Sequence, residues 1–496
     1  MWTLLRFVLL LFVLAPAVAE ATTPFWVRIV DAETGRGVPL VRISAPDYVK
    51  WTDSNGVAVV DDARLQGRDV TFAIESAGYV FEPKQGAAIR VEAGKSVELQ
   101  LRRLNIAERL YRATGANIYG DSVRAGLTVP IAKPLINARV TGQDTVIATI
   151  YKGKIFWCWG DTDGELQADG KKRFNGKVSC ATSELPGKGG LDPSVGIDYT
   201  YFTRPDGFTR QMVPIPVRGL VWIEGLFTVK DEQGRERLLA TYTIQQAKTK
   251  PFESGIVAFD DAAGEFRVIA RFPPRPRHTS SHPFVTRVDG KDYLYLYPVQ
   301  RVPFEWKAIL DPGRYESYTC LKSGAKLDME NPPLERDATG KLVCGWKHDA
   351  DWLTGDRERA LLTRGLIDIA HANFPLLNTK TGKPTGARAD SVAWNRYRNK
   401  WILLSKDNGT VYYSEADQPQ GPWVKAVPVS SQLPYRLYNV ARHPFFDSAD
   451  GRFIYYEGTF IHKLSQTDVV VPDYDYNNLV YRLDLSDPRL EAARTP

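Results

Sequence analysis

Short apolar runs separated by polar turns recur along most of the chain. Residues 144–161 show the pattern clearly, because two apolar runs are joined by the turn Lys152-Gly153-Lys154. Runs of this kind, rich in β-branched and aromatic residues and bounded by turn residues, indicate strands. The stretch is therefore predicted to form a β-hairpin. Asp144 opens it and Asp161 closes it, although Asp is depleted in strands.

Four further segments repeat this rhythm between residues 219 and 488. Each combines an apolar run, a polar turn with Gly or Asn, and a second run rich in Tyr, Trp, Phe or Leu. They contain the motifs GLVWIEGLF, HPFVTRV, ARADSVAW and VARHPFF. Five such units around an axis predict a five-bladed β-propeller over residues 116–488. An irregular sandwich of hairpins is the alternative.

Residues 305–375 lack this period and are predicted to form a loop-rich insertion between the third and fourth units. The four cysteines of the chain are consistent with two local disulfides, Cys158–Cys180 and Cys320–Cys344. The second pair would form a covalent cross-link within the insertion. Free thiols are the alternative, and the spacings do not resemble a zinc site.

The N-terminus resembles an export signal. Arg6 precedes an apolar run that ends before Ala17-Val18-Ala19, so residues 1–19 are predicted to be a cleaved signal peptide. An uncleaved anchor is the alternative, but the run is short for a membrane span. The mature protein is expected to be secreted or periplasmic, with no membrane contact after cleavage.

Residues 25–103 contain alternating runs such as WVRIV and VTFAI between turn clusters, which predicts a small β-sandwich. The order D-x-x-T-G-x-G-V-P, then T-D-S-N-G, then A-G-Y resembles the carboxypeptidase-regulatory-like domain. That resemblance implies an accessory domain. Residues 104–115 are predicted to be a short helical linker, and the whole chain is predicted to be all-β: a sandwich followed by a propeller.

Composition narrows the possible partners. The net charge of +6 results from 64 basic and 58 acidic residues. Because these charges are spread along the chain, no basic surface for nucleic acid is expected. Twelve Trp and 23 Tyr are typical of exported carbohydrate-handling proteins, whose rings stack on sugars, although aromatic residues also favour strands. A polysaccharide or oligosaccharide substrate is expected.

Titratable residues are predicted at the start of each inner strand, where they would converge on one mouth of the channel. These are Asp144, Glu224, His282, Asp390 and His443. Antiparallel strands return the chain, so Asp161 is expected beside Asp144. Paired carboxylates are the groups that glycoside hydrolysis requires, although Asp161-Thr162 could instead cap a turn.

Weaker candidates surround this pair. Glu457 in YYEGTF is predicted to end its hairpin as Asp161 does, and is the third catalytic candidate. Arg388 and Arg442 could bind acidic groups of a substrate, and Trp159 could contact it. His282 and His443 could bind a substrate hydroxyl or carboxylate, or hold a metal together with Asp or Glu. No segment has metal-ligand spacing, so neither a metal nor a cofactor is expected.

The stretch Asp144–Thr162, ending W-G-D-T, resembles the first blade of five-bladed propellers that include endo-D-arabinanases, within the arabinanase-like glycoside hydrolases. The resemblance implies that Asp144 and Asp161 are the catalytic pair. Trp159 stands where Phe is common in that group, and the two His-Pro-Phe histidines have no counterpart there. Two other functions remain open: a polysaccharide lyase using His, Tyr and Arg, and a non-catalytic glycan-binding module.

Overall fold

The computed structural model describes residues 23–217, 219–246, 250–273, 282–463 and 465–494. The predicted signal peptide lies outside these residues. The described chain is nearly all β, as predicted, with three short α-helices: α1 (Gly120–Arg124), α2 (Trp306–Ile309) and α3 (Gly355–Thr363). Short 3-10 helices occur at Pro312–Arg314, Ile369–His371, Pro444–Phe446 and Pro488–Ala493. Within the described ranges, no helix is both long and apolar enough to cross a membrane.

Two four-stranded sheets make up the N-terminal domain. One has the order β4 (Val57–Val60), β1 (Phe25–Asp31), β8 (Ser96–Arg103), β6 (Tyr79–Val80). The other has the order β3 (Tyr48–Trp51), β2 (Arg42–Ala45), β5 (Asp69–Glu75), β7 (Ala87–Arg90). Alternate residues of the two sheets meet in one core that includes Val27, Ile29, Ile43 and Phe72. Both sheets fall within residues 25–103.

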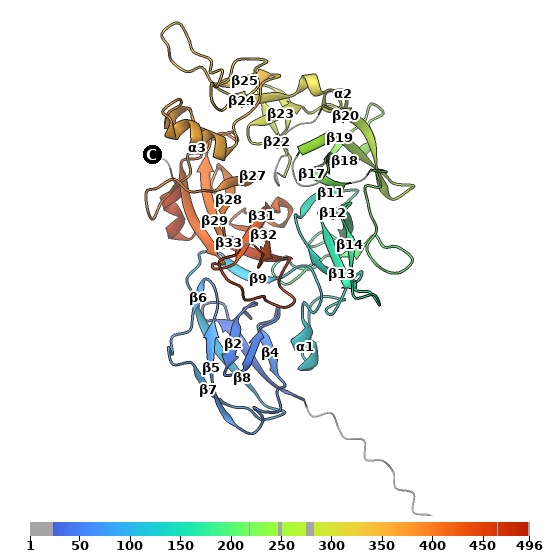
Figure 1. Cartoon of the computed structure of the whole chain (residues 1–496), viewed down its shortest axis with the longest axis vertical. Helices are drawn as coiled ribbons and strands as arrows, with labels where there is room; N and C mark the ends of the chain where they lie inside the picture. Colours follow the sequence, from blue (N-terminus) through green and yellow to red (C-terminus); the bar gives the residue numbers. More distant parts are fainter. Residues whose placement is uncertain (1–22, 218, 247–249, 274–281, 464, 495–496) are drawn as a thin grey trace, which may run out of the picture.

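Five antiparallel sheets follow in chain order and form a propeller-like ring (Figure 1). The first contains β11 (Ile147–Tyr151), β12 (Lys154–Trp159), β15 (Ser179–Ser183) and β16 (Thr200–Tyr201). The second contains β17 (Leu220–Lys230), β18 (Glu236–Gln246), β19 (Lys250–Asp260) and β20 (Glu265–Phe272). The third contains β21 (Phe284–Val288), β22 (Lys291–Tyr297), β23 (Gln300–Pro303), β24 (Glu316–Thr319) and β25 (Gly345–His348).

The fourth and fifth sheets complete the ring. The fourth contains β27 (Arg388–Asn395), β28 (Lys400–Asp407), β29 (Thr410–Ala416) and β30 (Lys425–Ser431), with β26 (Leu377–Asn378) parallel to β30. The fifth contains β31 (Arg436–Arg442), β32 (Phe453–Ile461), β33 (Asn477–Asp484) and β9 (Glu108–Arg112). A smaller sheet of β10 (Val140–Gln143), β13 (Thr162–Leu166) and β14 (Lys172–Asn175) lies beside the first. The first strands β11, β17, β27 and β31 lie toward the centre of the ring (Figure 1).

The predicted helical linker is wrong, because residues 108–112 form strand β9 instead. This strand pairs antiparallel with β33, with Arg112 opposite Leu479, and so completes the fifth sheet from the N-terminal side of the ring. Leu110 and Tyr111 are fully buried against residues of the first sheet such as Trp157. This burial and the pairing with β33 explain the strand, because both depend on residues that are distant in sequence.

The segment 305–375 is only partly an insertion. Its strands β24 and β25 extend the third sheet, while α3 and the loops around it form a separate small core with Leu342, Leu353 and Leu361. Both predicted disulfides are present. Cys158 and Cys180 face each other across β12 and β15, and Cys320 joins Cys344 next to the small core.

Removing the second disulfide should destabilise the protein measurably. The double variant Cys320→Ala/Cys344→Ala loses a bridge between residues separated by 24 positions. The expected fall in the free energy of unfolding is about 3 kcal/mol, because the bridge restricts the unfolded chain. Urea titration followed by fluorescence measures it. A reductant should lower the free energy of unfolding more in the wild type, which has two disulfides to lose, than in the variant, which has one. Equal stability of the variant and the wild type without reductant would contradict the expectation.

Candidate functional site

Asp144 and Asp161 lie side by side at one end of the first hairpin, as predicted. Asp144 lies in the connection between β10 and β11, and Asp161 lies in the connection between β12 and β13. The backbone N–H of Asp161 donates to Asp144 Oδ1 at 3.0 Å, and Gly160 N donates to Asp144 O at 2.9 Å. Gly160 leaves room for this contact, because a Cβ at this position would lie 2.5 Å from Asp144 Oδ1. The hairpin therefore delivers both partly buried carboxyl groups to the same place.

Two tyrosines from the fifth sheet hold the Asp144 carboxylate from the other side. Tyr438 Oη, on β31, donates to Asp144 Oδ2 at 2.7 Å. Tyr476, just before β33, also hydrogen-bonds Asp144. Burial, the negative charge of Asp144 and these hydrogen bonds raise the pKa of both tyrosines well above the ordinary value. Both phenols therefore remain protonated donors near neutral pH.

An unusual backbone surrounds this carboxylate. Thr145 and Asn439 have positive φ angles of 56° and 52°, a conformation that costs on the order of 1–3 kcal/mol for such residues. Asn439 Nδ2 donates to Thr145 Oγ1, and Thr145 N donates to Thr459 Oγ1 at 3.3 Å. The two strained residues thus join the first and fifth sheets at the position of Asp144.

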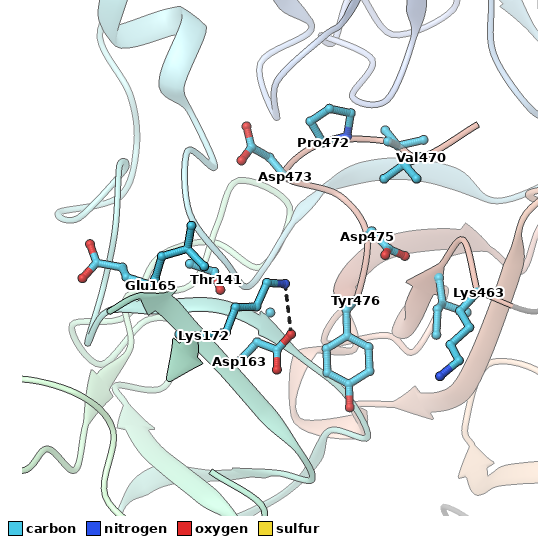
Figure 2. A pocket seen from close by; sticks show the side chains of 15 residues that line it. Thr141, Asp163, Glu165, Lys172, Lys463, Val470, Pro472, Asp473, Asp475 and Tyr476 are labelled. Atoms are coloured by element: carbon cyan, nitrogen blue, oxygen red, sulfur yellow. Dashed lines mark hydrogen bonds and ion pairs between the residues drawn. The ribbon is translucent and has the colours of Figure 1, made fainter. Parts of the chain in front are cut away.

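A cavity of about 570 Å³ opens at the same seam. Figure 2 shows Asp163, Glu165 and Lys172 on one wall, and Asp473, Asp475 and Tyr476 on the opposite one. Tyr476 lines the cavity and also hydrogen-bonds Asp144, whereas Asp144 and Asp161 themselves are not among the lining residues.

Cationic side chains offset part of the negative charge of this cavity. Lys172 Nζ lies 3.3 Å from Asp163 Oδ2, and a dashed line marks this ion pair in Figure 2. Arg139 Nε donates to Glu165 at 2.6 Å. The lining also includes Lys463 and the exposed Val470. The cavity is open to solvent, and its lining combines these charged groups with apolar side chains.

A second cluster of titratable residues is buried deeper in the ring. His443 Nε2 lies 2.7 Å from Glu457 Oε1, and the two side chains are 1% and 0% exposed. The His282 ring stacks on His443 at 5.7 Å, and Trp157 packs edge-on against His443 at 5.1 Å. Burial and the adjacent His443 lower the pKa of His282 to about 3, so its ring is neutral.

The predicted places of His443 and Glu457 along their strands are wrong. The inner strand β31 is Arg436–Arg442, so His443 follows its end. Glu457 lies within β32, opposite Ala441 and Val480, and does not end a hairpin as Asp161 does. The motif VARHPFF misled the prediction because apolar residues continue past the strand into the 3-10 turn Pro444–Phe446.

Glu224 and Asp390 both occupy bulges of inner strands. Glu224 interrupts the register of β17 and lines a small cavity of about 30 Å³ with Thr241 and Gln300. Asp390 interrupts β27 and is 3% exposed. Burial raises the pKa of Asp390 to about 7, although Lys406 and Arg388 oppose the shift. The two carboxyl groups thus lie inside the ring, away from the cavity of Figure 2.

Three predicted substrate-binding residues are engaged in other contacts. Arg388 forms an ion pair with Asp356 of α3 at 2.7 Å. Arg442 is completely buried, bonded to Asp447 and to the carbonyl of Ala393. Trp159 is 1% exposed, stacked on Tyr201 and edge-on to Tyr199. Arg442 and Trp159 therefore cannot reach a glycan at the surface, because core packing covers them.

Tyr438, Tyr476 and Asn439 were not predicted as site residues. Their strand and loop belong to the fifth sheet, which meets the first only when the ring closes. The only local indication of a site role was the polar dipeptide Tyr438-Asn439 between the apolar residues Leu437 and Val440. Among the described residues, no group of three or more His, Cys, Asp or Glu side chains is arranged to hold a metal ion.

No protein-family model matches the chain. No curated protein matches it either. Solved structures with a similar fold include a candidate hydrolase from Bacteroides ovatus (12% identity, 69% of this chain and 86% of that chain, TM-score 0.41). Another is a GH43_1 enzyme from Xanthomonas citri with xylotriose (12% identity, 69% of this chain and 86% of that chain, TM-score 0.32). A third is an exo-1,5-α-L-arabinanase from a bovine ruminal metagenomic library (10% identity, 70% of this chain and 94% of that chain, TM-score 0.32).

Proposed function

We propose that this protein is an exported glycoside hydrolase in which Asp144 and Asp161 are the catalytic pair. The observation that carries the proposal is the position of the Asp144 carboxylate. It is held by the Asp161 N–H and by Tyr438 Oη, and Tyr476, which also hydrogen-bonds Asp144, lines a cavity of about 570 Å³. The five sheets would be the blades of a propeller, and the N-terminal domain a carboxypeptidase-regulatory-like sandwich.

The hydrogen bonds suggest different roles for the two carboxyl groups. Donors from Asp161 N, Tyr438 and Tyr476 stabilise the ionised form of Asp144. Asp144 would therefore act as the base or nucleophile at the anomeric carbon. Asp161 would donate a proton to the leaving oxygen, because two adjacent carboxylates disfavour double ionisation. Glu457 would then have no direct part in the reaction.

A lyase finds less support in this arrangement. Proton abstraction next to a uronate needs a base together with an arginine that neutralises the carboxylate. His282 and His443 are stacked in the interior, whereas Arg388 and Arg442 have acidic partners elsewhere. The cavity wall contains Asp163, Glu165, Asp473 and Asp475, which disfavours acidic glycans. The proposed substrate is therefore a neutral polysaccharide or oligosaccharide.

The test uses residues 20–496 with the variant Asp161→Asn. Both proteins are incubated with neutral, uronic and sulfated polysaccharides, while reducing ends and the ultraviolet absorbance of unsaturated sugars are followed. We expect reducing ends from the wild type on a neutral glycan, without that absorbance, and a loss of roughly 10²-fold or more in the variant.

The matched control is Asp169→Asn, an exposed carboxylate in the neighbouring β13–β14 turn, which should hydrolyse the glycan at the wild-type rate. Unsaturated products that persist in Asp161→Asn would instead favour a lyase. Binding of glycans without any product would favour the binding-module alternative.

A further inference from the structure

The wall of the cavity that carries Tyr476 is a loop between β32 and β33. Residues 470–476, named here the 470–476 segment, line the cavity at several positions. Tyr476 N donates to Phe460 O at 2.9 Å, and Gln143 N donates to Tyr476 O at 2.7 Å. This backbone therefore places Tyr476 between the first and fifth sheets, where its side chain hydrogen-bonds Asp144.

The conformation of this segment is unfavourable by itself. Asp473 and Tyr476 have positive φ angles of 63° and 62°. Residues other than glycine keep such angles only when the surrounding structure imposes them. One side of that support is Asn477, whose Nδ2 donates to Asp473 O and to Thr141 O at 3.0 Å each.

The other side of the support comes from the N-terminal domain. Tyr474 is 3% exposed; its Oη donates to Thr52 O at 2.7 Å and accepts a bond from Leu40 N at 3.2 Å. The guanidinium of Arg112, on the closing strand β9, lies 4.9 Å over the Tyr474 ring and donates to Asp473 O. Tyr474 thus ties the 470–476 segment to two backbone groups of a different domain.

The domain that supplies these groups is firmly packed on the ring. Leu40 belongs to the same core as residues of the fourth and fifth sheets, and Ser54 Oγ accepts a bond from Arg112 N of β9 at 3.1 Å. Val59 N donates to Asp121 on α1 at 3.1 Å. A firmly held domain can fix a neighbouring loop, whereas a flexibly tethered one could not.

We propose that the N-terminal domain is a positioning part of the candidate active site. Tyr474 is the positioning residue: by anchoring the 470–476 segment to Thr52 and Leu40, it keeps Tyr476 against Asp144 and shapes the cavity. The catalytic consequence rests on the proposed hydrolase function, whereas the structural coupling does not. An accessory spacer would leave the segment unaffected by changes at this contact.

The test compares Tyr474→Phe with Tyr456→Phe in the full mature chain. Tyr456 is also a buried tyrosine of the fifth sheet, but its Oη donates to Ser430 Oγ of β30 at 2.9 Å and not to the N-terminal domain. Hydrogen exchange followed by mass spectrometry reports on the amides of Gln143 and Tyr476. We expect these amides to exchange at least roughly tenfold faster in Tyr474→Phe only.

Steady-state kinetics on the glycan cleaved by the wild type gives the second readout. Tyr474→Phe should lower kcat on the order of tenfold, because misplaced catalytic groups react slowly, while Tyr456→Phe stays near the wild type. Unchanged exchange in Tyr474→Phe, or equal increases in both variants, would overturn the proposal. If the wild type cleaves no glycan, the hydrolase function fails, and the exchange comparison still decides the coupling.

Discussion

The variant Asp144→Asn is expected to lose hydrolytic activity almost completely, with kcat/KM falling by roughly 10³-fold or more. Asn has nearly the same shape, and its oxygen can still accept the bond from Asp161 N. The fold should therefore persist while the negative charge that would attack the anomeric carbon, or activate water, is absent. Initial rates of reducing-end formation measure the loss, and circular dichroism confirms the fold.

Tyr438→Phe is the matched control for this result. It removes one donor to Asp144 and leaves the charge in place. The expected loss is smaller, on the order of tenfold. The acidic limb of the pH–rate profile should also move to higher pH, since a hydrogen bond that favours the ionised carboxylate is lost. An Asp144→Asn variant with more activity than Tyr438→Phe would contradict the assignment of Asp144.

The variant Asp390→Asn is expected to stabilise the protein at pH 8. The pKa of Asp390 is raised from 3.8 to about 7 by burial, so the native state favours the protonated form. The contribution of Asp390 to the free energy of unfolding is therefore largest below about pH 4, and it is lost as the pH rises through about 7. Asn is neutral throughout, so at pH 8 the gain is on the order of 4 kcal/mol if the whole shift is realised.

Urea titrations at pH 4 and pH 8 measure this difference. At pH 4 the wild type and Asp390→Asn should have nearly equal free energies of unfolding, whereas at pH 8 the variant should be more stable. Burial also raises the pKa of Glu358 to about 7. Because both proteins contain Glu358, its effect on stability cancels in the difference between them. The exposed Asp169→Asn should show no such gain. A variant that is less stable at pH 8 would show that Asp390 makes an essential ionised contact.

Local features of the structure were predictable because their partners are near in sequence. The contact between Asp144 and Asp161 follows from one hairpin, in which the chain returns to its starting point. The pair Cys158–Cys180 is local in the same way, since two neighbouring strands place the residues opposite each other. The strand patterns around these residues contain enough apolar alternation to indicate the first sheet.

Features that depend on ring closure were not predictable in this way. Residues 108–112 form a strand because β33, far along the chain, offers a free edge. The start of the fifth unit was misplaced because the apolar residues of VARHPFF continue beyond β31. Trp159 and Arg442 were expected near substrate, but the packing of adjacent sheets buries both.

By itself, the amino-acid sequence determined the all-β character, the sequence of hairpin units, the disulfide pairs and the carboxylate pair of the first unit. These depend on alternation and on short loops. Only the tertiary structure brought Tyr438 and Tyr476 to Asp144, closed the fifth sheet with β9, and linked Tyr474 to the N-terminal domain. Such contacts join residues up to several hundred positions apart, so no local pattern specifies them; burial and hydrogen bonding in the closed ring do.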